Sequence, residues 1–224
     1  FSREDQDAFA ITSVTRAREA AEAGRFDDEI APVTISTRKG ESVVSEDDGP
    51  KAADIDKIPT LRPAFRKDGT VTAASSSSIS DGAASLILMR ASEAAAKGIP
   101  VLATIAGHSG FAHEPEWFTT APVSAINALH RQLGWDAGSV DLYEINEAFA
   151  CVTMAAMHDI GIDHDKVNVN GGACALGHPI GASGARIIVT LLHALRNRGG
   201  GKGIASLCIG GGEAVAIGID VDPA

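Results

Sequence analysis

The sequence of 224 residues contains few aromatic residues, few cysteines and no long apolar run. Aromatic residues make up only 4% of the chain, so Ala, Val, Ile and Leu must form most of the core. No apolar run approaches the ~20 residues that a membrane-spanning helix needs, and we therefore expect no membrane segment. Acidic residues outnumber basic ones by 29 to 19, which excludes a general basic surface for nucleic acid.

The cysteine content is also low. Cys151, Cys174 and Cys208 are scattered and form no C-x-x-C pair. An odd number of cysteines without a disulfide framework favours a reducing compartment, and we expect a cytoplasmic protein. The sequence also lacks the ligand spacing of a structural zinc site, so no metal is expected. The N-terminus is polar and shows no signal peptide, although a removed targeting segment would leave no trace.

The first 23 residues favour a helix. Ser2 and Asp5 have the spacing of a capping box, and Gly24 is a suitable residue to end the helix. The segment from 2 to 23 is rich in alanine and charge and poor in large apolar side chains. We therefore expect it to lie on the surface rather than in the core.

Residues 25–80 change character, with four prolines and several charge clusters. Short strands are expected at 33–36 and 42–44, and the remainder is expected to be loop. A disordered linker is the alternative, but it would expose apolar residues such as Ile58 and Phe65 without a reason. A functional loop or subdomain is therefore favoured.

From residue 81 onward, strands and helices alternate. Strands are expected at 84–89, 101–106, 140–145, 167–169, 203–209 and 214–221, and helices at 92–97, 122–133, 147–159 and 183–198. The last two strands surround a triple-glycine turn, which is typical of a hairpin. This alternation predicts an α/β layered domain whose central strands are covered on both faces.

Three segments that follow predicted strands each carry one chemically useful side chain. These side chains are Asn146, His178 and Cys208. Sites in open α/β sheets form outside the carboxyl ends of the strands, so we expect the three to converge. Taken singly, each has a structural interpretation. The histidine could be part of a turn, Asn146 could cap a helix starting at Glu147, and Cys208 could be a small buried apolar residue.

The long glycine-rich segment at 171–184 matches neither the dinucleotide-binding nor the P-loop pattern. Its glycines would instead allow the backbone to approach a ligand and would expose N–H groups at the start of the next helix.

The three segments together carry a family resemblance. N-E-A-F-A begins at Asn146, G-G-A-C-A-L-G-H-P-I-G-A-S-G-A-R begins at Gly171, and C-I-G-G-G-E-A begins at Cys208. This set resembles the C-terminal half of the thiolase family, of the acetyl-CoA acetyltransferase type. Upstream runs such as L-R-P-A-F and S-D-G-A-A resemble the same family, so the resemblance covers essentially the whole chain.

The resemblance implies an α/β fold of the thiolase type, with αβαβα layers built from two similar halves. This chain would hold the second half and most of the loop domain. Residues 1–79 would form the loop-domain segment, 80–101 the last strand and helix of the N-terminal half, and 102–224 the C-terminal thiolase domain.

The resemblance also implies roles for four residues. His178 would activate a nucleophilic cysteine and help to hold the thioester oxygen. Cys208 would be the acid/base that takes the α-proton of acetyl-CoA, and a cysteine needs only modest tuning of its pKa for this. Asn146 would hold a water in one oxyanion hole, and the N–H of Gly210 would contribute to the other.

Five further residues would bind substrate. Ser77 falls where the family has a serine that contacts coenzyme A, although here it lies in a run of four serines. Phe65, Ala73 and Phe149 fall on positions that line the coenzyme A and pantetheine channel. Phe118 replaces a methionine that is common in the family, and it would reshape the acyl pocket.

The implied activity is acyl transfer between coenzyme A thioesters, by Claisen condensation or thiolytic cleavage, without a metal or redox cofactor. The family implies a homo-oligomer, either a dimer or a tetramer. The sequence does not match the surroundings of the family's acylated cysteine, and the chain starts at Phe1, so we expect an upstream segment. The alternative is a non-catalytic thiolase remnant that binds coenzyme A. A ketoacyl synthase is disfavoured because that class lacks the C-x-G-G-G base.

Overall fold

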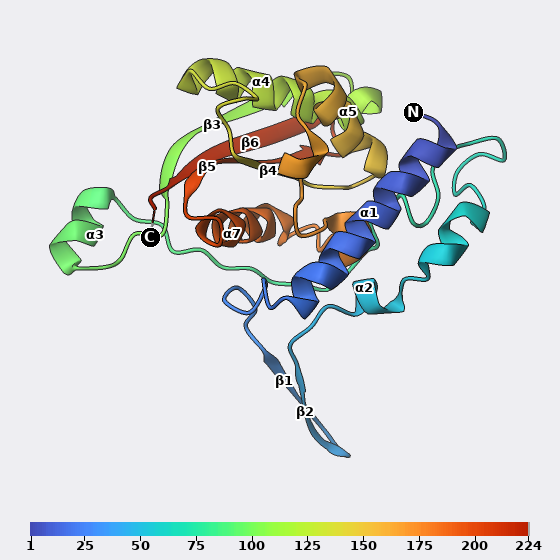
Figure 1. Ribbon diagram of the computed structural model, residues 1–224, viewed down its shortest axis with the longest axis horizontal. Helices are drawn as coiled ribbons and strands as arrows, with labels where there is room; N and C mark the ends of the chain where they lie inside the picture. The colour runs from blue at the N-terminus through green and yellow to red at the C-terminus, as the bar shows by residue number, and fades with distance from the viewer. Residues whose placement is uncertain (224) are drawn as a thin grey trace.

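A mixed four-stranded sheet forms the centre of the molecule, which is a computed structural model describing residues 1–223 (Figure 1). Its strand order is β3-β6-β5-β4. The strands are β3 (Thr104–Ala112), β4 (Leu142–Ile145), β5 (Gly201–Ile209) and β6 (Glu213–Val221). The pair β4 and β5 is parallel, whereas β6 runs antiparallel to both of its neighbours. The predicted C-terminal hairpin is therefore confirmed.

Helices cover both faces of this sheet, as the sequence predicts. Helices α4 (Ala121–Leu133) and α5 (Ala150–Ile160) pack on one face, and α7 (Ser183–Arg196) packs on the other. Neighbouring residues of β4 point to opposite faces: Tyr143 belongs to the α4/α5 core, and Leu142 belongs to the α7 core. The predicted α/β layered arrangement is confirmed.

The N-terminal third packs along the side of the domain, where α1 contacts α5 and α6. The remaining elements are α1 (Arg3–Glu22), β1 (Val33–Thr37), β2 (Gly40–Val44), α2 (Asp48–Ala52), η1 (Ile55–Thr60), α3 (Ala91–Lys97), η2 (Pro115–Thr120), η3 (His164–Lys166) and α6 (Ala173–Leu176). Helix α1 begins with the predicted capping box, in which Ser2 and Asp5 bond each other's backbone. Strands β1 and β2 form an exposed hairpin that projects from the body (Figure 1).

Helix α1 is not the surface helix that its composition suggested. Phe9, Val14 and Ala17 are buried, and the helix packs against α5 and α6. Its alanines are small enough for two backbones to approach closely, which a count of large apolar side chains does not register.

Several local predictions are wrong. Residues 84–89 form no strand, because within residues 1–223 no neighbouring strand pairs with them, and Ile87 is 89% exposed. The strand expected at 101–106 begins at Thr104, and the one at 167–169 is reduced to a single bridge. The disordered-linker alternative for 25–80 is also wrong, since this region contains two further helices and buries Ile58.

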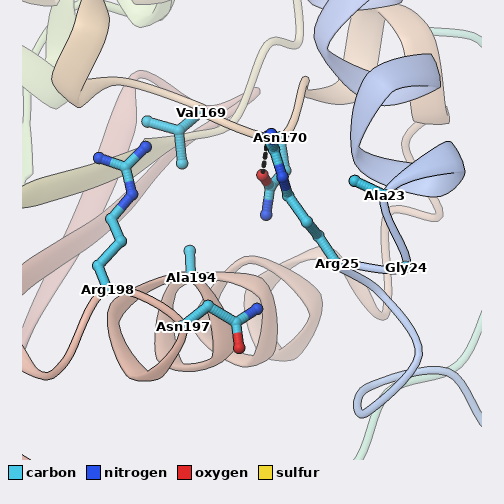
Figure 2. Close-up of a pocket in the computed structure, with 8 residues that line it drawn as sticks. All are labelled: Ala23, Gly24, Arg25, Val169, Asn170, Ala194, Asn197 and Arg198. Carbon is cyan, nitrogen blue, oxygen red and sulfur yellow. Dashed lines mark hydrogen bonds between the residues drawn. The ribbon is translucent and has the colours of Figure 1, made fainter.

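The ends of α1 and α7 face each other across a cavity of about 500 Å³ (Figure 2).

Each of the helices among residues 1–223 is too short or too polar to cross a bilayer.

Candidate active site

Asn146 and Cys208 lie at the same edge of the sheet. Asn146 directly follows β4, and its N–H donates to the carbonyl of Ser206 on β5 at 2.9 Å. Cys208 lies two residues further along β5, opposite Ala214 of β6. Since β4 and β5 are parallel, their carboxyl ends meet at one edge, and both residues are found there.

A chain of backbone contacts brings His178 to this edge. The N–H of His178 donates to the carbonyl of Ser78 at 2.9 Å. The neighbouring Ser77 donates its N–H to the carbonyl of Ala148 at 3.1 Å, two residues after Asn146. The serine run therefore joins the segment that carries His178 to the segment that carries Asn146.

Ser183 orients the His178 imidazole, a partner that the sequence interpretation missed. Nδ1 of His178 lies 2.5 Å from Oγ of Ser183, and that hydroxyl also lies 3.1 Å from the carbonyl of Pro179. Both contacts are satisfied when Ser183 donates to Pro179 and Nδ1–H donates to Ser183, which leaves Nε2 as an acceptor. Burial, and secondarily the charge of Arg186, lowers the pKa of His178 and favours this neutral form.

Cys208 is a protonated thiol at neutral pH. Its residue is 7% exposed, and burial raises its pKa to about 11. The sequence argument assumed that modest tuning would bring the pKa near ambient pH, but the apolar strand environment moves it in the opposite direction. The thiol is therefore well suited to give a proton, and it can act as a base only where nearby donors stabilise the thiolate.

Asn146 is a buried carboxamide whose Oδ1 and Nδ2 have no hydrogen-bond partner among residues 1–223. The helix-cap interpretation is wrong, because α5 begins at Ala150 with Phe149 as its N-cap. Leaving a buried polar group unpaired costs about 1–3 kcal/mol, so such a group points to a bound water or ligand. Gly210 follows β5 with open space beside its Cα, which leaves its backbone accessible.

Most of the predicted substrate-binding residues also come together. Phe149 makes edge-to-face contacts with Phe65, at 6.0 Å between ring centroids, and with Phe118, at 6.3 Å. The hydroxyl of Ser77 donates to the carbonyl of Ala148, next to Phe149. Ala73 is exposed at a neighbouring turn.

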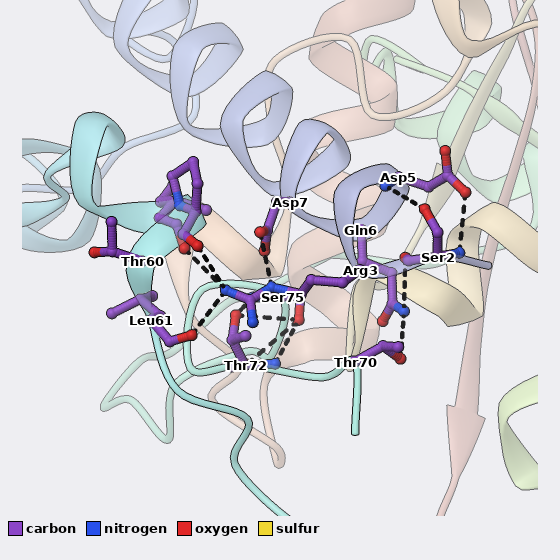
Figure 3. Close-up of polar contacts among 12 residues, drawn as sticks. Ser2, Arg3, Asp5, Gln6, Asp7, Thr60, Leu61, Thr70, Thr72 and Ser75 are labelled. Carbon is purple, nitrogen blue, oxygen red and sulfur yellow. Dashed lines mark hydrogen bonds and ion pairs between the residues drawn. The ribbon is translucent and has the colours of Figure 1, made fainter. Parts of the chain in front are cut away.

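The N-terminus of α1 forms hydrogen bonds to the loop at 61–72, which leads to the serine run (Figure 3). Arg3 donates to the carbonyl of Leu61 at 2.8 Å and pairs with Asp7 at 2.7 Å. Nε2 of Gln6 donates to Oγ1 of Thr70 at 2.8 Å. These contacts fix the position of the loop relative to the rest of the fold.

Glu147 joins three segments beneath the site. Its Oε2 accepts from the hydroxyl of Ser13 at 2.7 Å and from the N–H of Cys174 at 3.0 Å. Its Oε1 accepts from Nδ2 of Asn168 at 2.8 Å. The sequence interpretation did not single out Glu147; the available signal was an acidic residue between the polar Asn146 and the apolar residues 148–150.

Family comparisons agree with this geometry. Residues 99–221 match the C-terminal domain of thiolase, and residues 1–92 match the N-terminal domain. The acetyl-CoA acetyltransferase of Pseudomonas aeruginosa is 49% identical over 218 residues, covering 96% of this chain and 56% of its own length.

Solved structures show the same fold. The Bacillus anthracis acetyl-CoA acetyltransferase superposes with a TM-score of 0.95 at 46% identity, and a thiolase of Ascaris suum, solved in complex with coenzyme A, superposes with 0.86 at 40%. Each alignment covers 99% of this chain and 56% of the other. The chain thus spans little more than half the length of the relatives that it matches.

Proposed function

Because this chain belongs to the thiolase family, we propose that it supplies the C-terminal catalytic residues for acyl transfer between coenzyme A thioesters. The observation that carries the proposal is the buried, unpaired carboxamide of Asn146 at the sheet edge that also holds Cys208. His178 reaches the same edge through the serine run. The reaction is a Claisen condensation or its reverse, a thiolytic cleavage.

Each residue has a distinct role in this reaction. The Cys208 thiol first gives its proton to the coenzyme A thiolate that leaves when the nucleophilic cysteine is acylated. In the condensation, the resulting Cys208 thiolate takes the α-proton of an acetyl thioester, and the carbanion attacks the acyl group held on that cysteine, which leaves as the thiolate. Nε2 of His178 takes the proton of that cysteine when it is acylated. Asn146, through a water, and the N–H of Gly210 stabilise the oxygens on which charge develops.

Coenzyme A thioesters are the proposed substrates, and no metal or redox cofactor takes part. The aromatic cluster around Phe149 lines the pantetheine channel, with Ser77 and Ala73 beside it. Phe118 approaches Phe149 and limits the acyl group. The protein acts as a homo-oligomer.

The acylated cysteine must come from outside these residues. Cys151 and Cys174 have pKa values that burial raises, and neither is placed by the family motif as the nucleophile. If no such cysteine is supplied, the chain is a non-catalytic remnant that binds coenzyme A.

Replacing Cys208 with alanine should lower the rate of acetoacetyl-CoA thiolysis by about 10²- to 10⁴-fold, because the residue that acts as the acid and base is lost. The measurement is the disappearance of acetoacetyl-CoA in the presence of coenzyme A, made with the full-length gene product. The matched control is Cys151→Ala, which removes a half-buried thiol that has no proposed role, and it should keep most of the activity.

Two outcomes separate the alternatives. Coenzyme A binding by calorimetry without any turnover of the full-length product would favour the non-catalytic remnant. Near-normal turnover of the Cys208 variant would contradict the role proposed for Cys208.

A further inference from the structure

Two unpaired arginines face the cavity between the ends of α1 and α7. Arg25 follows α1 and Arg198 follows α7, and Figure 2 shows them on either side of the cavity. Neither forms an ion pair with a carboxylate among residues 1–223, although the chain has a net charge of −10. Arg198 also lies near Arg16, whose pKa is lowered first by burial and in part by this repulsion.

A buried carboxamide is aimed into the same cavity. Asn170 is only 4% exposed, and its Oδ1 accepts from Nη1 of Arg25 at 3.5 Å. This contact turns the NH₂ group of Asn170 toward the open space, as Figure 2 shows. Asn197 provides a second carboxamide from the end of α7. The lining thus offers amide donors beside two guanidinium groups.

Apolar side chains complete the lining. Val169 and Ala194 face the space between the arginines. At about 500 Å³ the cavity has the size of a small-molecule site and is much larger than an inorganic ion requires. Asp27 lies close to the lining residue Gly24, since a Cβ added to Gly24 would lie 2.8 Å from its carboxylate, so the cavity has an anion nearby as well as two cations.

We propose that this cavity binds a small phosphate ester, with the phosphate between Arg25 and Arg198 and the organic part on Val169 and Ala194. Guanidinium groups match phosphate oxygens through paired N–H donors, and a dianion balances two unpaired cations. A cation after a helix C-terminus offsets the helix dipole, which explains the sign of both residues. It does not explain a concave lining or a buried carboxamide directed into it.

The site is independent of the proposed acyl transfer. Helix α7 has 14 residues and is therefore about 20 Å long. Its N-terminal Ser183 contacts His178, whereas the cavity lies at the opposite end. Failure of either proposal leaves the other untouched.

Calorimetric titration of this chain with adenosine monophosphate at low ionic strength tests the proposal. Saturable binding is expected, and Arg25→Ala and Arg198→Ala should each weaken it at least 10-fold. The matched control is Arg196→Ala, which removes an exposed arginine of the same helix that does not line the cavity, and it should change the affinity less than twofold. The three arginines are exposed, so the variants should fold, and amide NMR spectra check this.

A parallel titration with inorganic phosphate examines the organic part of the ligand. Tighter binding of the nucleotide, with a shift of the side-chain NH₂ signal of Asn170, would support the proposal. Equal affinity for inorganic phosphate would overturn the assignment to an ester. Absence of saturable binding, or an equal loss in the Arg196 variant, would overturn the site itself.

Discussion

Replacing Glu147 with alanine is expected to lower the free energy of unfolding by about 3–5 kcal/mol. The change removes the acceptor for Ser13, Asn168 and the N–H of Cys174, three donors that lie in buried or part-buried surroundings. It also leaves a void against Gly172, where an added Cβ would lie 2.3 Å from the carboxylate. Urea denaturation of this chain measures the effect.

The control for this prediction is Glu22→Ala, which removes an exposed carboxylate at the end of α1 and should change the stability by less than about 0.5 kcal/mol. Glu147→Gln keeps the volume but turns one acceptor into a donor, so it should cost an intermediate amount. A Glu147→Ala chain as stable as the wild type would show that the three donors find other partners, and the proposed joining role would be wrong.

The importance of Glu147 could not be read from its position in the motif. The sequence places it next to Asn146, but two of its partners, Ser13 and Cys174, lie 134 and 27 residues away. Long-range pairing of this kind depends on how α1 packs, and the helix was expected at the surface. Because α1 was expected at the surface, the sequence analysis missed both its burial and the need for Glu147 to accept the hydrogen bond of Ser13.

The regular half of the chain was predicted well because its periodicity reflects its own packing. The spacing of Ile126 and Leu129 in α4 and of Ile187 and Leu191 in α7 matches the faces that these helices bury. Residues 84–89 are equally apolar, but among residues 1–223 no strand pairs with them. The strand predicted there from composition alone was therefore wrong. A β-strand forms only where a neighbouring strand supplies its hydrogen bonds, whereas an amphipathic helix forms its hydrogen bonds within the segment that shows the pattern.

The sequence predicted where the site residues lie because they follow strands whose carboxyl ends meet at one edge of the sheet; the chemistry of the side chains played no part in that prediction. Asn146 and Cys208 meet because β4 and β5 are parallel neighbours. The sequence argument took the pKa of Cys208 to need only modest tuning, whereas burial, which no motif reports, raises it to about 11. Ser183, the partner of His178, was hidden among the small residues of the glycine-rich segment.

Raising the pH from 6.5 to 8.5 is expected to destabilise this chain through a buried charge cluster. Burial raises the pKa of Glu144 to about 8 and that of Glu29 to about 7, and it also raises the pKa of Asp47. All three share one cation, Arg186, which lies 3.5 Å from Oε2 of Glu144. Oε1 of Glu144 and Oε2 of Glu29 have no partner among residues 1–223, so the single cation does not satisfy both carboxylates.

The sign follows from the proton balance. Both glutamates have an ordinary pKa of 4.5, so between that value and 7 or 8 the folded chain holds protons that the unfolded chain has released. Their contribution to stability is therefore complete below pH 4.5 and is lost as the pH rises through 7 and 8. The buried histidines act in the opposite direction, because their lowered pKa values favour folding as the pH rises toward 6.5. Above pH 6.5 the carboxyl groups dominate.

Urea denaturation at several pH values between 6.5 and 8.5, on the wild type and on Glu144→Gln, measures the effect. The wild type should lose on the order of 1–3 kcal/mol across this window, and the variant should lose clearly less, because glutamine does not ionise. The difference between the two slopes reports the titration of Glu144 together with its coupling to Glu29 and Asp47 through Arg186, since the remaining titrating groups are common to both chains. Glu41→Gln removes an exposed carboxylate of the β1–β2 hairpin and should keep the wild-type slope. Parallel slopes in the wild type and the Glu144 variant would mean that Glu144 is ionised in the folded chain throughout, with Arg186 balancing its charge.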